Sequence, residues 1–113
     1  MIRTISAGEI RIGDDAFDHT IALTTETVIE DWPQKAVVDL TEDDFSPLLD
    51  FNPEIVVLGT GSSNVFAPRD LVFAMARRGT GFEVMNTAAA ARTFNVLAGE
   101  GRQVACVLYL SNE

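Results

Sequence analysis

The feature of this chain that most restricts its fold is a short apolar run, PEIVVLGTG at residues 53–61, which ends in a glycine turn. An apolar run of this length, rich in β-branched residues and closed by glycine, predicts a buried strand. The segments before it are short and acidic, whereas the segments after it carry almost no net charge. We therefore take residues 53–61 as the central strand around which the rest of the chain is organised.

The segments after this strand are predicted to alternate between helix and strand. The first is a helix because Pro68 stands near its start, basic residues stand near its end and Gly79 follows it. The second helix is an alanine-rich run that Thr87 is expected to cap and Gly99 to close. Strands joined through helices imply right-handed crossovers in a parallel or mixed sheet. The predicted order is helix 68–78, strand 81–86, helix 88–98 and strand 104–110.

The first half of the chain predicts short antiparallel strands, because their connections are too short for the crossovers that parallel strands need. A hairpin turn is expected at residues 13–15, and Thr41 followed by acidic residues predicts a short helix. The two halves together predict one α/β domain over residues 1–113, with antiparallel N-terminal strands followed by a βαβαβ C-terminal half. The expected N-terminal strands span residues 2–6, 9–12, 16–23, 27–30 and 36–38.

Composition agrees with a single globular domain. A chain of 113 residues with 47% apolar residues buries roughly two-thirds of its unfolded surface in one core. No apolar run approaches the roughly 20 residues that a membrane-spanning helix needs. The first residues show neither the apolar core of a signal peptide nor an amphipathic presequence. We therefore expect a cytoplasmic protein that does not insert directly into a membrane.

Charge is distributed unevenly along the chain. The net charge is −9, and residues 1–58 hold thirteen acidic residues against three basic ones. Residues 59–113 hold four acidic residues against five arginines. An acidic surface repels phosphate backbones and anionic lipids, so we expect no nucleic-acid binding and no electrostatic adsorption to a membrane. The C-terminal half can still offer arginine to an anionic ligand or to a protein partner.

No residue pattern indicates catalysis or a metal site. Cys106 is the single cysteine and lies in an apolar run, which excludes an intramolecular disulfide and a cysteine metal cluster. His19 is also alone and is expected on the surface of a strand. Neither Ser62 nor Ser63 has a histidine that the sequence places within reach. We therefore expect no cofactor, and an enzyme is the less favoured class.

The glycine turn is the first candidate site. Gly59, Thr60, Gly61 and Ser62 follow a strand as in a dinucleotide-binding turn, but Asn64 replaces the third glycine that such a turn needs. The backbone amides of residues 59–63 could nonetheless form an anion-binding nest. The alternative interpretation is a turn that lets the backbone pass close to a neighbouring element.

A second candidate group consists of Thr93, Asn95, Glu100 and Arg102. Asn95 is expected on the polar side of its helix together with Arg92. Glu100 and Arg102 follow that helix and are expected to turn back towards the glycine loop, where α/β sheets usually bind ligands. Alternatively, Glu100 and Arg102 pair with each other or cap carbonyls, and so hold the turn into the last strand.

Four ordered motifs in the C-terminal half carry a resemblance to a known family. The sequence of residues 53–110 resembles a family of uncharacterised function that includes mitochondrial respiratory complex I assembly factor 3 and the adipogenesis-associated domain protein. The resemblance implies a three-layer α/β fold with a mixed sheet, and for the mitochondrial relatives a role in assembling a membrane complex. It implies no catalytic residues. The motifs are PEIVVLGTG at 53–61, GFEVMNT at 81–87, ARTFNVL at 91–97 and EGRQVA at 100–105.

Two functions of different classes follow. The first is a non-enzymatic interaction or assembly factor for a larger, respiratory or membrane, complex, with an unidentified protein partner. The second is a small-molecule or anion-binding domain that uses the glycine loop with Asn95 and Arg102, and that includes an enzyme as a special case. Loss of ligand binding on replacing Arg102 would distinguish the second from the first.

Overall fold

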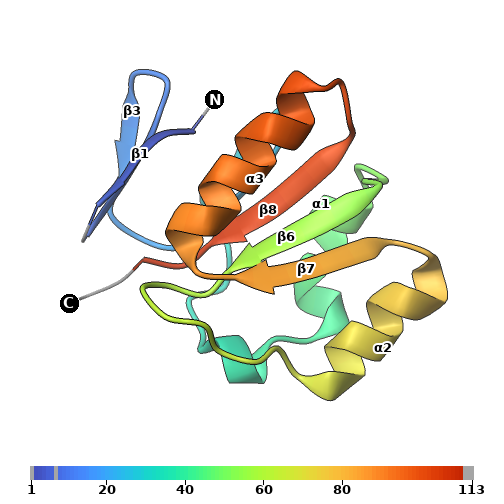
Figure 1. The fold of residues 1–113 in the computed structure, drawn as a ribbon. Coiled ribbons are helices and arrows are strands. Elements are labelled where there is room, and N and C mark those ends of the chain that lie inside the picture. Colours follow the sequence, from blue (N-terminus) through green and yellow to red (C-terminus); the bar gives the residue numbers. More distant parts are fainter. Residues whose placement is uncertain (1, 7, 111–113) are drawn as a thin grey trace.

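The computed structural model describes residues 2–6 and 8–110 of the chain (Figure 1). Two sheets and two longer helices make up most of it. The strands are β1 Ile2–Ser6, β2 Glu9–Ile12, β3 Asp15–Phe17, β4 Ile21–Thr24, β5 Val28–Ile29, β6 Ile55–Gly59, β7 Gly81–Met85 and β8 Val104–Leu108. The helices are the 3₁₀ turns η1 Val37–Asp39 and η2 Glu42–Phe45, and the α-helices α1 Ser46–Leu49, α2 Arg69–Arg78 and α3 Thr87–Gly99.

The main sheet has five strands in the order β5-β4-β8-β6-β7. β6 pairs in parallel with β8 on one side and with β7 on the other. β8 pairs antiparallel with β4, which forms an antiparallel hairpin with β5. β1, β2 and β3 form a separate antiparallel sheet. The expected α/β fold, with a mixed sheet and a βαβαβ C-terminal half, is confirmed.

Alternation along β6 produces two apolar cores, because successive strand side chains point to opposite faces of a sheet. Val56 and Leu58 lie in the core that α2 and the short helices cover. Val57 lies in the opposite core, under α3 and the small sheet. All three side chains are fully buried. Figure 1 shows α3 and α2 on opposite sides of the main sheet, so the expected three layers are present.

Asn95 joins the small sheet to α3. Its Oδ1 accepts a hydrogen bond from the Ile2 amide at 3.1 Å, and its Nδ2 donates to the Ile2 carbonyl oxygen at 2.7 Å. Ile2 itself is buried in the same core as Phe94 of α3. The Asn95 side chain therefore satisfies both main-chain groups of one β1 residue, in the way that a neighbouring strand would.

Three local predictions are wrong. The strand expected at residues 16–23 is two strands, β3 and β4, in different sheets. The strand expected at 36–38 is the 3₁₀ turn η1. Thr87 does not cap α3, because the cap is Asn86, whose Oδ1 accepts from the Ala89 amide at 2.9 Å. Thr87 is instead the first residue of α3, and its hydroxyl bonds elsewhere.

Replacing Asn95 by Ala should destabilise the chain by about 1–3 kcal/mol, because both main-chain groups of Ile2 lose their partner in a half-buried place. Arg92→Ala, an exposed change on the same helix, should stay within about 0.5 kcal/mol of the parent. Urea unfolding followed by circular dichroism measures both. Equal stability of the two variants would contradict the proposed role of Asn95.

Candidate functional site

The glycine turn lies where β6 passes under the start of α3. A methyl group on Gly59 would lie 2.9 Å from the Thr87 Cα and 3.0 Å from the Ala90 Cβ. Real Cβ atoms do not approach a backbone carbon so closely, so only glycine allows the two elements to touch. Gly61 has a φ of +100°, which residues with a side chain rarely adopt. The expectation of a close backbone approach at this turn is confirmed.

The Thr87 hydroxyl connects three segments at this junction. It accepts a hydrogen bond from the Gly61 amide at 2.8 Å and donates to the Tyr109 carbonyl oxygen at 2.6 Å. The Thr87 amide in turn donates to the Gly61 carbonyl oxygen at 2.8 Å. Thr87 is almost completely buried. These bonds fix the turn after β6 against α3 and against the residue that follows β8.

Thr60 forms hydrogen bonds within the loop that follows β6. Its hydroxyl donates to the Ser63 carbonyl oxygen at 2.7 Å and accepts from the Val65 amide at 3.3 Å. The Thr60 amide donates to the Met85 carbonyl oxygen at 2.9 Å. The amides of Thr60, Gly61 and Val65 are therefore all bound to protein oxygens. An anion held by the Thr60 and Gly61 amides of the predicted nest would have to displace these bonds.

Glu100 and Arg102 lie at the opposite end of the main sheet. β6 and β8 run parallel and in step, so the residues that precede β8 lie beside the residues that precede β6. The Arg102 Nε donates to the Glu54 Oε1 at 3.1 Å, and the Gln103 amide donates to the Glu54 Oε2 at 3.1 Å. The expectation that Glu100 and Arg102 turn back to the glycine loop is wrong, and the ionic partner of Arg102 is Glu54.

The candidate residues on α3 also have different surroundings from those expected. Thr93 lies on the flank of α3 near β7, where its hydroxyl is 3.4 Å from the Met85 sulfur. Asn95 lies on the other flank and is bound to β1. Ser62 is exposed at the tip of the glycine turn. The eight candidate residues therefore do not converge on one pocket.

A hollow that the sequence did not suggest lies beside the glycine loop. It has a volume of about 400 Å³ and is bordered by the loop after the turn, by Val72 of α2 and by Val84 of β7. Phe66 borders it and is 94% exposed. Val65, Val72 and Phe73 are also exposed apolar side chains of this region. We call this the α2-side hollow; its lining residues are Asn64, Val65, Phe66, Ala67, Val72 and Val84.

A second hollow lies along the flank of α3. Its volume is about 370 Å³, and Arg92, Thr93, Val96 and Leu97 line it. Because the Thr93 hydroxyl touches the Met85 sulfur, this hollow opens on the β7 side of the helix. Val96 is 60% exposed. We call it the α3-side hollow. β7 thus has one partly apolar hollow on each of its faces.

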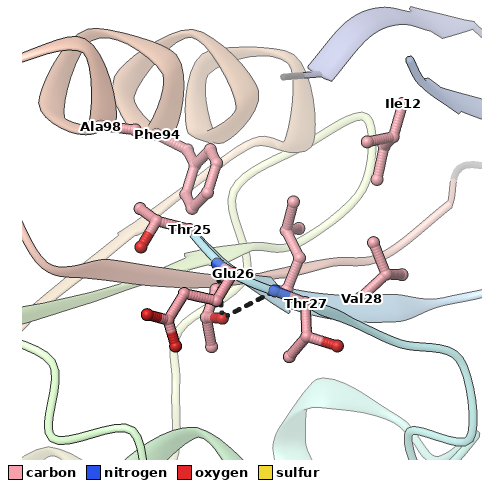
Figure 2. Close-up of a pocket in the computed structure, with 9 residues that line it drawn as sticks. Ile12, Thr25, Glu26, Thr27, Val28, Phe94 and Ala98 are labelled. Atoms are coloured by element: carbon pink, nitrogen blue, oxygen red, sulfur yellow. Dashed lines mark hydrogen bonds between the residues drawn. The ribbon is translucent and has the colours of Figure 1, made fainter.

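A third cavity, of about 600 Å³, lies between the small sheet, the β4–β5 hairpin and α3. Figure 2 shows Ile12, Val28 and Phe94 around an opening whose lower rim carries Thr25, Glu26 and Thr27. The Thr24 hydroxyl accepts from the Glu26 and Thr27 amides at 3.1 Å each and so shapes that rim. The cavity brings together no pair of groups with a catalytic arrangement, and we assign it no ligand.

The chemistry-bearing side chains are scattered. Cys106 is buried, and its burial raises the pKa of the thiol well above 9.0, which suppresses the thiolate that nucleophilic chemistry requires. His19 lies in a bend between β3 and β4, where its Nε2 is 3.0 Å from the Glu30 carbonyl oxygen. Among the described residues, no three His, Cys, Asp or Glu side chains are grouped to hold a metal. The same part of the chain contains no helix long and apolar enough to cross a bilayer.

Comparison with known proteins gives the family. The model of the family described as "Protein of unknown function (DUF498/DUF598)" matches residues 2–109. The chain belongs to this family. The resemblance found in the sequence motifs is therefore confirmed, and so is the uncharacterised status of the family's function.

Named relatives of the chain differ in what they are called. Human NADH dehydrogenase (ubiquinone) 1 alpha subcomplex assembly factor 3 is 39% identical over 89 residues, which are 77% of this chain and 48% of the human protein. The 13 kDa major membrane protein of Francisella tularensis subsp. holarctica is 27% identical over 101 residues, covering 88% of this chain and 80% of that protein. The chain therefore spans about half the length of the human relative.

A solved structure shows the same fold. The NMR structure of a Xanthomonas campestris protein superimposes with a TM-score of 0.90 at 32% identity, covering 99% of this chain and 85% of that one. Its agreement over nearly the whole chain includes both sheets and the two longer helices. This structure therefore has the same fold as the chain, whereas the two named relatives are called an assembly factor and a membrane protein.

Replacing Thr87 by Val should cost about 1–3 kcal/mol of stability, because the Gly61 amide and the Tyr109 carbonyl both lose a buried partner while the side-chain volume is kept. Thr25→Val is the matched control, since Thr25 is exposed on the rim of the third cavity. Guanidinium unfolding compares the two. A Thr87 variant as stable as the control would show that the junction does not depend on this hydroxyl.

Glu54 should make stability depend on pH below about 4.5. Hydrogen bonds from the Gln103 amide, and then from the Arg102 guanidinium, lower the pKa of Glu54 below its ordinary value of 4.5. Because the pKa is lowered by folding, the contribution of Glu54 is present above about pH 4.5 and is lost as the pH falls through the lowered pKa. Glu54→Gln should therefore be less stable than the parent at pH 7, and the difference should shrink at pH 3.

The control for this change is Glu26→Gln, because the Glu26 carboxylate makes no ion pair with any described residue. Urea midpoints at the two pH values give the comparison. A stability difference for Glu54→Gln that stays constant from pH 7 to pH 3 would contradict the assignment.

Proposed function

We propose that this chain acts without catalysis, as a protein-interaction module that takes part in assembling a larger complex. The observation that carries the proposal is the α2-side hollow with its exposed aromatic side chain. Phe66 is 94% exposed on a loop whose start is hydrogen-bonded in place through Thr60 and Gly61. Large apolar side chains grouped around a hollow are typical of surfaces that bind another protein.

The family relationship supports the same interpretation. The human relative, which matches 77% of this chain, is named as an assembly factor of NADH dehydrogenase. We extend that role to this chain as a proposal, with a respiratory or other membrane complex as the object assembled. The partner would then be a protein and not a nucleic acid, since the chain has a net charge of −9. The cytoplasmic location expected from the sequence stays a prediction.

The arrangement of side chains offers less support to the alternative of an anion-binding domain. The amides of Thr60 and Gly61 are already bonded within the protein. Arg102 is bound to Glu54 at the other end of the main sheet. The groups that the alternative would combine therefore do not lie together, and no specific observation favours it over the interaction module.

Phe66→Ser should abolish recovery of a partner without unfolding the chain. Because Phe66 is almost fully exposed, its replacement should change stability by no more than about 0.5 kcal/mol, whereas an aromatic anchor in an interface commonly contributes about 2 kcal/mol or more. The measurement is affinity purification of the tagged chain from the cells that make it, at natural abundance, with quantitative mass spectrometry. Subunits or assembly proteins of a membrane complex should be enriched with the parent and at least tenfold less with the variant.

Val38→Ser is the matched control for Phe66→Ser. Val38 is also an exposed apolar side chain, 62% accessible, but it lies on η1 and does not border either hollow beside β7. Its replacement should leave partner recovery unchanged. If the parent recovers no protein partner, the proposed function is wrong. If both variants recover the partner equally well, the location of the binding surface at the α2-side hollow is wrong.

A further inference from the structure

The edge of the main sheet at β7 presents main-chain groups without a partner. β7 is the last strand in the sheet order. The Gly81 amide donates to the Glu54 carbonyl oxygen at 2.9 Å, and the Met85 carbonyl accepts from the Thr60 amide. Gly81 and Met85 therefore bond towards β6, and the alternation of a parallel ladder directs the amides and carbonyls of Phe82 and Val84 to the open edge. An edge strand with such groups is a template for pairing with another strand.

The surroundings of this edge match the demands of an added strand. Side chains of an extended segment point alternately to the two faces of the sheet. On one face the segment would meet the α2-side hollow, to which Val84 contributes. On the other face it would meet the α3-side hollow, whose Thr93 touches Met85 of β7. Figure 1 shows β7 at the edge of the main sheet with α2 and α3 on either side of it. Main-chain bonding together with pockets for alternate side chains is how sheets bind extended peptides.

Charge indicates what kind of segment fits. Arg92 lines the α3-side hollow and makes no ion pair with any described residue. It would be complemented by an acidic side chain on that face of the incoming strand, placed beside Arg92 and not opposite Glu83, which lies on the same face as Met85. Glu83 is exposed at the middle of β7. In an antiparallel pair of two β7 strands centred on this residue, the two Glu83 carboxylates would lie opposite each other, which is unfavourable. The arrangement therefore favours a different protein over a second copy of this chain.

We propose that β7 accepts an extended segment of a partner protein as a sixth strand of the main sheet. The segment has an apolar side chain in the α2-side hollow and an acidic side chain directed at Arg92. This inference rests on the proposed function, since it specifies how the interaction module holds its partner. It adds to that function a mode of recognition by main-chain hydrogen bonds, in which the amides and carbonyls of Phe82 and Val84 bind the partner segment. Exposed apolar side chains alone do not imply such bonds.

Hydrogen exchange with residue resolution tests the main-chain part of the proposal. The complex is purified with the full-length tagged chain and compared with the free chain. In the free chain the Phe82 and Val84 amides should exchange faster than those of Glu83 and Met85, which face β6. In the complex, exchange at Phe82 and Val84 should slow at least tenfold. A complex in which both amides exchange as fast as in the free chain overturns this inference and leaves the proposed function standing.

Overlapping synthetic peptides that span the identified partner test the charge part. One peptide with alternating apolar and acidic residues should bind the chain, and Arg92→Glu should weaken that binding at least tenfold. Arg11→Glu is the control, because Arg11 is an exposed arginine of β2 in the small sheet, away from β7. Equal binding by the two variants overturns the assignment of Arg92.

Slowed exchange at Phe82 and Val84 in a self-associated chain overturns the choice of partner, and recovery of no complex at all overturns the proposed function and this inference together.

Discussion

The structure depends on the close contact between the end of β6 and the start of α3. A residue with any side chain in place of Gly59 would push α3 away from the sheet, because Thr87 and Ala90 already lie against it. The contact lets one hydroxyl, that of Thr87, hold the turn after β6 and the residue after β8 at the same time. With these segments fixed, the loop that carries Phe66 begins from a rigid point. The exposed apolar surface is thus presented by a well-supported loop.

Much of the fold could be predicted because local signals and tertiary structure agree. The buried run at residues 55–58, the helix between Pro68 and Gly79 and the alanine-rich helix all appear where the sequence places them. One wrong prediction arises where a side chain bonds to segments that are distant in the sequence. Thr87 has the features of a helix cap, yet its hydroxyl is taken by Gly61 and Tyr109, and the neighbouring Asn86 caps the helix instead. Nothing in a local window of sequence reveals that competition.

The candidate site was harder to predict, for two physical reasons. Parallel strands place their starts together, so the residues before β8 lie beside those before β6 and far from the glycine turn. Arg102 therefore meets Glu54, a consequence of topology that the motif spacing did not make visible. No periodic pattern of apolar residues in the sequence indicates the α2-side hollow. Val65 and Phe66 lie in a loop, and they form part of a surface only because α2 and β7 lie beside them in the fold. The apolar pair Val65 and Phe66 in a predicted loop is the one sequence feature that points to this surface.

The burial of Cys106 has a practical consequence for studying such a surface. The chain has one thiol, and it lies fully enclosed at the centre of the main sheet with its pKa raised. Thiol-directed reagents that act on exposed thiolates should leave the native chain unmodified. A cysteine introduced at an exposed position would then be the one reactive thiol, without any need to remove the native residue and disturb the core. The fold therefore provides a background on which single fluorophores or cross-linkers can be placed one position at a time.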